Sequence, residues 1–104
     1  MGKVHLELRD GSSMALEFGS DLENLMTVAV RAGVPGIRGE CGGAMACATC
    51  HVHVAPEWRE RVGPASQDER ELIDLTDDAA DDSRLACQIW LRDRLDGLSA
   101  RVGA

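Results

Sequence analysis

The sequence predicts a small α+β domain built around one cysteine-containing loop. Apolar and polar residues alternate near both ends of the chain, as they do in half-buried strands. Apolar residues at helical spacing follow the first alternating segment, and a glycine- and alanine-rich stretch with three cysteines interrupts the pattern in the middle. With 104 residues, we expect a single domain over 1–104.

The N-terminal part predicts a β-hairpin. Residues 4–9 and 14–18 each alternate between apolar and polar side chains. Asp10-Gly11 between them is a pair typical of tight hairpin turns. We place His5 on the polar side of the first strand, as a surface residue.

A helix is predicted after the hairpin. Ser20 and Glu23 have the spacing of a capping box, with Ser20 as the N-cap. Gly33 is suited to the position just after a helix end, and Pro35 prevents continuation. We expect the helix to pack on the hairpin through one apolar face: Leu22, Leu25, Met26, Ala29 and Val30.

The chain after the loop predicts a strand, a short helix and two more strands. In the strand 52–54, alternation places Val52 and Val54 inward and leaves His53 facing solvent. Ser66 and Glu69 form a second capping box, which predicts a short helix with Leu72, Ile73 and Leu75 buried. The remaining predicted elements are a strand over 85–89, a turn at Asp96-Gly97 and a closing strand over 98–102.

Four cysteines are split three plus one. Three follow C-x5-C-x2-C spacing in the loop, and the fourth comes after a gap of 36 residues: Cys41, Cys47, Cys50 and Cys87. The small residues between the first three let the backbone approach an inorganic core, and their amides can stabilise charge on sulfur. We assign this supporting role to Gly42, Gly43, Ala44 and Ala46.

Three interpretations of the cysteines compete. Disulfides are disfavoured because the chain begins Met1-Gly2-Lys3 without an apolar signal segment. Structural zinc is disfavoured because zinc sites typically present two short cysteine pairs, and only Cys47 and Cys50 form one. A [2Fe–2S] cluster is favoured, although the first gap is one residue longer than in plant-type ferredoxins.

The combined motif resembles the adrenodoxin/putidaredoxin family of [2Fe–2S] ferredoxins. It consists of Cys41-x5-Cys47-x2-Cys50-His51 and, after the long gap, Ser83-Arg84-Leu85-Ala86-Cys87-Gln88. The loop is nearer the bacterial putidaredoxin branch, and the resemblance covers essentially the whole chain. It implies a β-grasp fold with a mixed sheet, a main helix packed on it and a second, short acidic helix.

The resemblance also implies one [2Fe–2S] cluster held by the four cysteines. Cys41 and Cys47 would bind the outer iron, and Cys50 and Cys87 the inner one. His51 follows a ligand directly, and we expect it to hydrogen-bond across the loop and brace it rather than to bind metal. No nucleophilic triad or phosphate-binding loop is recognisable, so we expect an electron-transfer protein rather than an enzyme.

Negative charge is concentrated in one segment. The chain has a net charge of −7, and residues 66–82 account for all of it, with eight acids against the single base Arg70. Such a patch attracts a basic partner, whereas nucleic acid would select basic surfaces. The acids are Asp68, Glu69, Glu71, Asp74, Asp77, Asp78, Asp81 and Asp82.

The resemblance implies what the partners are. We expect a monomeric, cytoplasmic carrier between an FAD-containing ferredoxin reductase and a bacterial cytochrome P-450 monooxygenase, with no nucleic-acid or membrane partner. Electron donation to iron–sulfur cluster assembly is the alternative, and a zinc-binding interaction module is a third class. By resemblance, the partner-binding residues are Glu40, Asp68, Glu69, Glu71 and Asp74.

Overall fold

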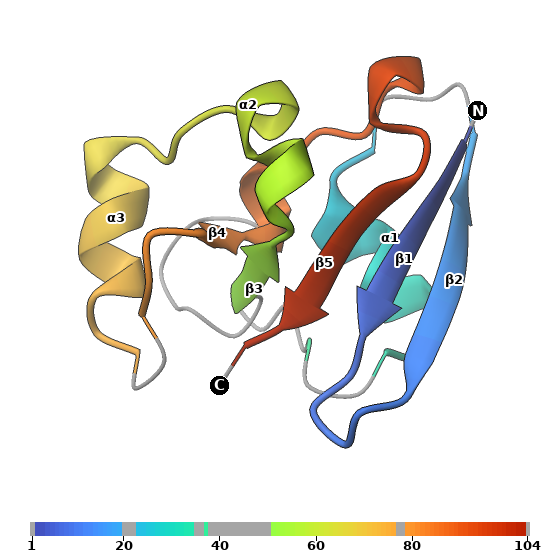
Figure 1. The fold of residues 1–104 in the computed structure, drawn as a ribbon, viewed down its shortest axis with the longest axis horizontal. Coiled ribbons are helices and arrows are strands. Elements are labelled where there is room, and N and C mark those ends of the chain that lie inside the picture. Colours follow the sequence, from blue (N-terminus) through green and yellow to red (C-terminus); the bar gives the residue numbers. More distant parts are fainter. Residues whose placement is uncertain (1, 20–22, 35–36, 38–50, 77–78, 104) are drawn as a thin grey trace.

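Five strands form one mixed sheet in the order β2-β1-β5-β3-β4 (Figure 1). The computed structural model describes residues 2–19, 23–34, 37, 51–76 and 79–103. The α+β prediction is confirmed. The strands are β1 (Gly2–Glu7), β2 (Ser13–Phe18), β3 (His51–Val54), β4 (Ser83–Leu85) and β5 (Leu98–Val102).

The last strand in the sequence lies in the centre of the sheet. β5 runs parallel to β1, with Val4 opposite Leu98, and antiparallel to β3, with Val52 opposite Val102. β1 pairs with β2 and β3 pairs with β4, both antiparallel. β5 therefore joins the N-terminal hairpin to β3, which follows the cysteine loop in the sequence, and through β3 to β4, which follows the acidic helix.

The predicted hairpin is confirmed, and its turn is held by local hydrogen bonds. The backbone amide of Leu8 donates to the carbonyl of Ser12, and Gly11 adopts φ +90°, which favours glycine. The amide and hydroxyl of Ser12 both donate to the Asp10 carboxylate. These two hydrogen bonds, the hydroxyl's first, lower the pKa of Asp10 because they stabilise its charged form.

The first helix begins later than predicted. α1 spans Leu25–Arg31, and its N-cap is Asn24, whose side chain accepts from the amide of Thr27. The proposed capping box is wrong because Glu23 precedes the helix; Ser20 and Leu22 lie outside the described residues. Tertiary pairing holds this segment extended, since the amide of Leu91 donates to the carbonyl of Glu23 at 2.8 Å.

The end of α1 agrees with the prediction, but its buried face differs by one residue. Gly33 adopts φ +74° directly after the C-cap Ala32. Val30 is 44 % exposed, contrary to expectation, and Val28 is buried instead. Burial of Leu25, Met26 and Ala29 is confirmed, and the helix packs on the sheet through this face.

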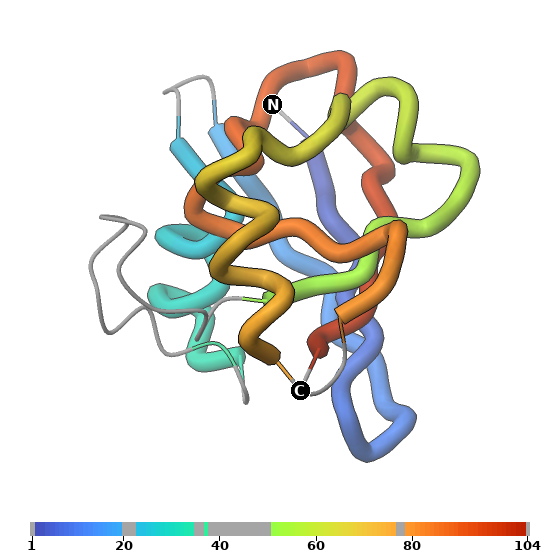
Figure 2. The backbone as a smooth tube through the Cα atoms, turned by 90° about the vertical axis from the view of Figure 1, so that its left-hand side faces the viewer, coloured from blue at the N-terminus to red at the C-terminus, as the bar shows by residue number. Residues whose placement is uncertain are grey.

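The acidic helix packs beside β4, and its outer side faces the viewer in Figure 2. α3 (Gln67–Ile73) is capped by Ser66, whose hydroxyl accepts from the amide of Glu69 as predicted. The Glu69 carboxylate does not complete the predicted capping box, because it bonds to Arg84 and to the amide of Leu85 instead. Ile73 is fully buried and Leu72 packs against the core, but Leu75 is 80 % exposed because the helix has already ended. The short helices elsewhere are η1 (Pro56–Trp58), α2 (Arg59–Val62), η2 (Ala86–Gln88) and η3 (Asp93–Leu95).

The predicted strand over 85–89 is only partly correct. β4 ends at Leu85, and the chain turns at once into η2, where the amide of Ile89 donates to the carbonyl of Ala86. The turn at Asp96-Gly97 and the closing strand are confirmed. No helix in the described part of the chain is long and apolar enough to cross a membrane.

Candidate metal centre and docking surface

Cys87 is the one predicted cluster ligand within the described residues. It lies in η2 and is 1 % exposed, and the Gln88 side-chain amide donates to its sulfur at 3.5 Å. Its chain neighbours Leu85, Ala86 and Ile89 are all buried. Outside the described ranges lie Cys41, Cys47 and Cys50, together with Glu40, Gly42, Gly43, Ala44 and Ala46.

Strand register brings His51, the last residue of the first part of the motif, next to the second part, which contains Cys87. β3 begins at His51, immediately after Cys50 in the sequence, and His51 pairs with Leu85, two residues before Cys87. The buried thiol of Cys87 thus lies where the cysteine loop re-enters the sheet. This arrangement fits a fourth thiolate for a centre whose other ligands come from the loop.

Other side chains in the described ranges do not form a metal site. No cluster of three or more His, Cys, Asp or Glu residues there could hold a metal ion. The two histidines of β3 bond to oxygen groups instead, as described next. The buried thiol of Cys87 is of the donor type that holds iron–sulfur clusters, which are bound by cysteine thiolates.

His51 ties the strand after the loop to the start of β4. Its ring is 2 % exposed, and Nε2 lies 2.7 Å from the Ser83 hydroxyl, which also accepts from the amide of Ala80. The His51 carbonyl accepts from the amide of Gly103 at 2.9 Å. The residue next to Cys50 is thereby linked to the segment that follows the acidic helix and to the end of β5.

Gly103 makes this packing of the His51 ring feasible. A Cβ at Gly103 would lie 2.7 Å from His51 Nδ1, closer than van der Waals contact allows. We expect Gly103→Ala to lower the free energy of unfolding by about 1–3 kcal/mol, measured by urea denaturation. Gly19→Ala, where a Cβ meets no atom within 4 Å, is the control. Equal effects of the two substitutions would contradict the steric argument.

His53 is buried, so the expectation of a solvent-facing ring is wrong. It is 3 % exposed, its Nδ1 lies 2.6 Å from Asp82 Oδ1, and the His51 and His53 ring centroids are 4.7 Å apart. β3 is an interior strand between β5 and β4, and the Asp82 side chain covers the polar face that alternation assigned to solvent. A period-two pattern cannot reveal this, because it does not show which segment will cover a face.

Glu69 differs from the other predicted docking acids. Asp68, Glu71 and Asp74 are exposed, whereas Glu69 is 2 % exposed. Its Oε2 lies 2.7 Å from Arg84 Nε and also accepts from the backbone amide of Leu85 at 2.8 Å. Glu69 therefore does not contribute to the acidic surface.

Helical spacing was the signal that could have predicted the burial of Glu69. Glu69 and Ile73 are four residues apart, so they share the face of α3 that packs against β4. A buried carboxylate there requires a cation, and Arg84 in the middle of β4 supplies it. The pairing joins the acidic helix to the strand that leads into Cys87.

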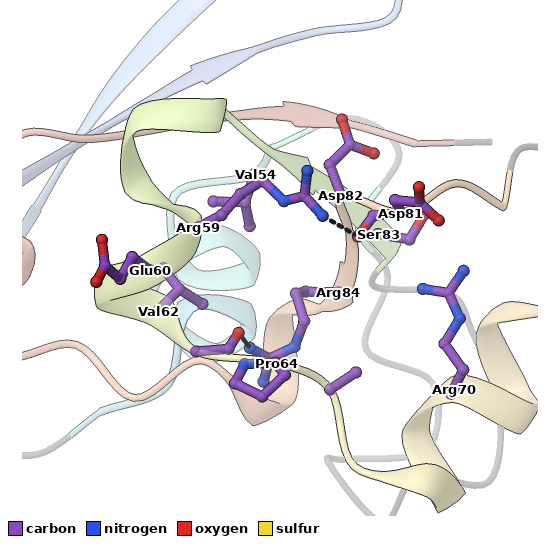
Figure 3. A pocket seen from close by; sticks show the side chains of 12 residues that line it. Val54, Arg59, Glu60, Val62, Pro64, Arg70, Asp81, Asp82, Ser83 and Arg84 are labelled. Carbon is purple, nitrogen blue, oxygen red and sulfur yellow. Dashed lines mark hydrogen bonds between the residues drawn. The ribbon is translucent and has the colours of Figure 1, made fainter.

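A cavity of about 490 Å³ lies next to this ion pair, between α2, α3 and β4 (Figure 3). Arginines form hydrogen bonds to backbone carbonyls around it: Arg59 to Asp81 at 2.9 Å, and Arg84 to Gly63 at 2.7 Å. Arg70 of α3 donates to the carbonyl of Ala80 at 3.0 Å. The carbonyls of Ala80 and Asp81, which follow the acidic helix, are thus bound by an arginine of α3 and an arginine of α2.

Comparisons with known proteins agree with this geometry. Residues 8–92 match the family model of the 2Fe-2S iron–sulfur cluster binding domain. Ferredoxin CarAc of a Sphingomonas species is 54 % identical over 79 residues, which cover 76 % of this chain and 72 % of CarAc. Putidaredoxin of Pseudomonas putida is 37 % identical over 103 residues, which cover 98 % of this chain and 95 % of putidaredoxin.

Solved structures show the same fold. A chain from the covalent putidaredoxin reductase–putidaredoxin complex superposes with a TM-score of 0.91 at 34 % identity, covering 97 % of both chains. The β-grasp expectation is therefore confirmed. Relatives of this kind are electron carriers rather than enzymes. The chain belongs to the 2Fe-2S iron–sulfur cluster binding domain family, as a putidaredoxin-type ferredoxin whose cofactor is one [2Fe–2S] cluster.

Proposed function

We propose that this protein is a cytoplasmic one-electron carrier between an FAD-dependent ferredoxin reductase and a cytochrome P-450 monooxygenase. The likeness to putidaredoxin along nearly the whole chain carries the proposal, and that relative has been solved in a covalent complex with its reductase. The exposed acids of α3 are consistent with a basic protein partner.

The cluster, when bound, accepts and releases one electron at a time. We assign its four thiolates to Cys41, Cys47, Cys50 and Cys87. The buried position of Cys87 keeps water from one side of the site, and His51 links the end of the loop to Ser83. The small residues Gly42, Gly43, Ala44 and Ala46 are assigned to close wrapping of the loop, and Glu40 to the partner contact beside it.

The proposal is tested by capturing the partner proteins on the carrier and then assaying electron transfer with them. Cluster-loaded protein is immobilised, exposed to lysate of the source organism at low ionic strength, and eluted with salt. A flavoprotein that reduces the carrier with NADH or NADPH, and a haem protein that then shows the thiolate-ligated reduced-CO band, would support the proposal. A flavoprotein eluting with a cysteine desulfurase, and no haem protein, would refute the monooxygenase assignment in favour of cluster assembly.

The acids of α3 are expected to accelerate encounter with the reductase. Neutralising Asp68, Glu71 and Asp74 together, as Asn, Gln and Asn, should slow reduction by about tenfold at low ionic strength and flatten its salt dependence. Stopped-flow measurement over a series of salt concentrations checks this. Because all three side chains are exposed, the fold should be unaffected.

A matched control removes the same charge elsewhere. Glu7, Glu17 and Glu57 are exposed acids that belong to β1, β2 and η1 rather than to α3. Changing all three to Gln alters the net charge equally but should retain most of the salt dependence. If both triple variants behaved alike, overall charge rather than the acids of α3 would govern encounter.

A further inference from the structure

Leu75 is the most exposed large apolar side chain in the described part of the chain. It is 80 % exposed, compared with 44 % for both Val30 and Trp90. A single surface leucine needs no explanation by itself. Two features distinguish this one: how its backbone is held, and which side chains surround it.

The backbone that presents Leu75 is hydrogen-bonded on both sides of the residue. Its own amide donates to the carbonyl of Leu72 at 3.1 Å. The amide and hydroxyl of Thr76 both donate to the carbonyl of Ile73, at 2.9 and 2.6 Å. The leucine therefore projects from an ordered turn that continues α3, and little conformational entropy would be lost on docking.

Leu75 extends the row of exposed acids on α3. Asp68, Glu71 and the C-cap Asp74 are spaced i, i+3 and i+6 and are all exposed. Leu75 directly follows Asp74 in the turn that ends the helix. An apolar side chain bordered by like charges matches the anatomy of a protein interface, with an apolar centre and a polar rim.

We propose that Leu75 is the apolar anchor of the docking surface and inserts into an apolar pocket rimmed by Lys and Arg on the ferredoxin reductase. Acids alone would attract any cationic surface, whereas the leucine selects one that also offers an apolar recess. The reductase is the assigned occupant because a putidaredoxin relative with the same fold has been solved in a covalent complex with its reductase. The inference rests on the proposed function and specifies its contact.

The test separates apolar from electrostatic binding. Rates of reduction are measured against carrier concentration, with the reductase of the source organism and with putidaredoxin reductase, at low and high salt. For Leu75→Ser we expect KM for the carrier to rise about tenfold with kcat unchanged, since an anchor supplies binding rather than chemistry. The slope of the salt dependence should stay at the wild-type value, and Leu75→Met should restore KM.

Val30→Ser is the matched control, because it removes an exposed apolar side chain from α1. It should leave KM unchanged, and visible absorption and thermal unfolding should show that all variants are loaded and folded. An unchanged KM for Leu75→Ser with an active reductase would overturn the inference and leave the proposed function standing. Failure of both reductases to reduce the wild-type protein would refute the proposed function itself.

Discussion

Replacing Cys87 by serine is expected to abolish stable binding of the cluster and to lower the thermal stability of the protein sharply. Metal binding and folding are coupled, because the ligands are brought together only in the folded chain. Cys87 is 1 % exposed at the junction of β4 and η2, so the site cannot recruit a surface residue in its place. Iron and sulfide analysis, visible absorption and thermal unfolding measure the outcome.

Gln88→Ala provides the control for this prediction. It removes the side-chain amide that donates to the Cys87 sulfur but keeps the thiol. This variant should remain coloured, with one cluster per chain, and differ from wild type mainly in reduction potential, which hydrogen bonds to sulfur help to set. A Cys87→Ser protein with a full cluster and wild-type stability would contradict the ligand assignment.

Replacing Glu69 by alanine is expected to lower the free energy of unfolding by about 3–5 kcal/mol, because the buried guanidinium of Arg84 would be left without a counter-ion. The Arg84 side chain is only 10 % exposed and would lose its counter-ion, while the amide of Leu85 would lose its acceptor. Urea denaturation of the cluster-loaded protein, followed by circular dichroism, measures the change. Loss of the pair should also loosen α3 from β4.

Glu71→Ala is the matched control, two residues further along the same helix. Its side chain is exposed, so its removal should change the free energy of unfolding by less than about 0.5 kcal/mol. Glu69→Gln should be intermediate, since the amide still offers an oxygen to Arg84 but carries no charge. Equal destabilisation by Glu69→Ala and Glu71→Ala would show that the buried ion pair does not hold the helix.

Patterns within short stretches of sequence correctly predicted the elements that are determined by neighbouring residues. The hairpin follows from alternation and Asp10-Gly11, and the start of α3 follows from Ser66 as N-cap. Gly33 ends α1 because glycine readily adopts a positive φ. In each case the residues that determine the structure lie within a few positions of the element itself.

The errors arose where distant segments meet. Glu23 is held extended by the chain around Leu91, so α1 starts later than its local signal indicated. His53 is covered by Asp82, and Glu69 turns inward to Arg84, 15 residues away. No local pattern contains these partners. The cysteine motif was recognisable because its spacing and its fourth member are specific as a set, even though the residues are far apart in the sequence.

The central position of β5 has a consequence for how the protein is made. Ribosomal synthesis releases residues 2–85, with four of the five strands, before Leu98–Val102 can emerge. Until then, the edges of β1 and β3 that β5 will join have unpaired amides and carbonyls, which are prone to pairing with other chains. The nascent chain thus has the strands of both halves of the sheet but lacks the strand that joins them, and the sheet is completed only when β5 has been synthesised.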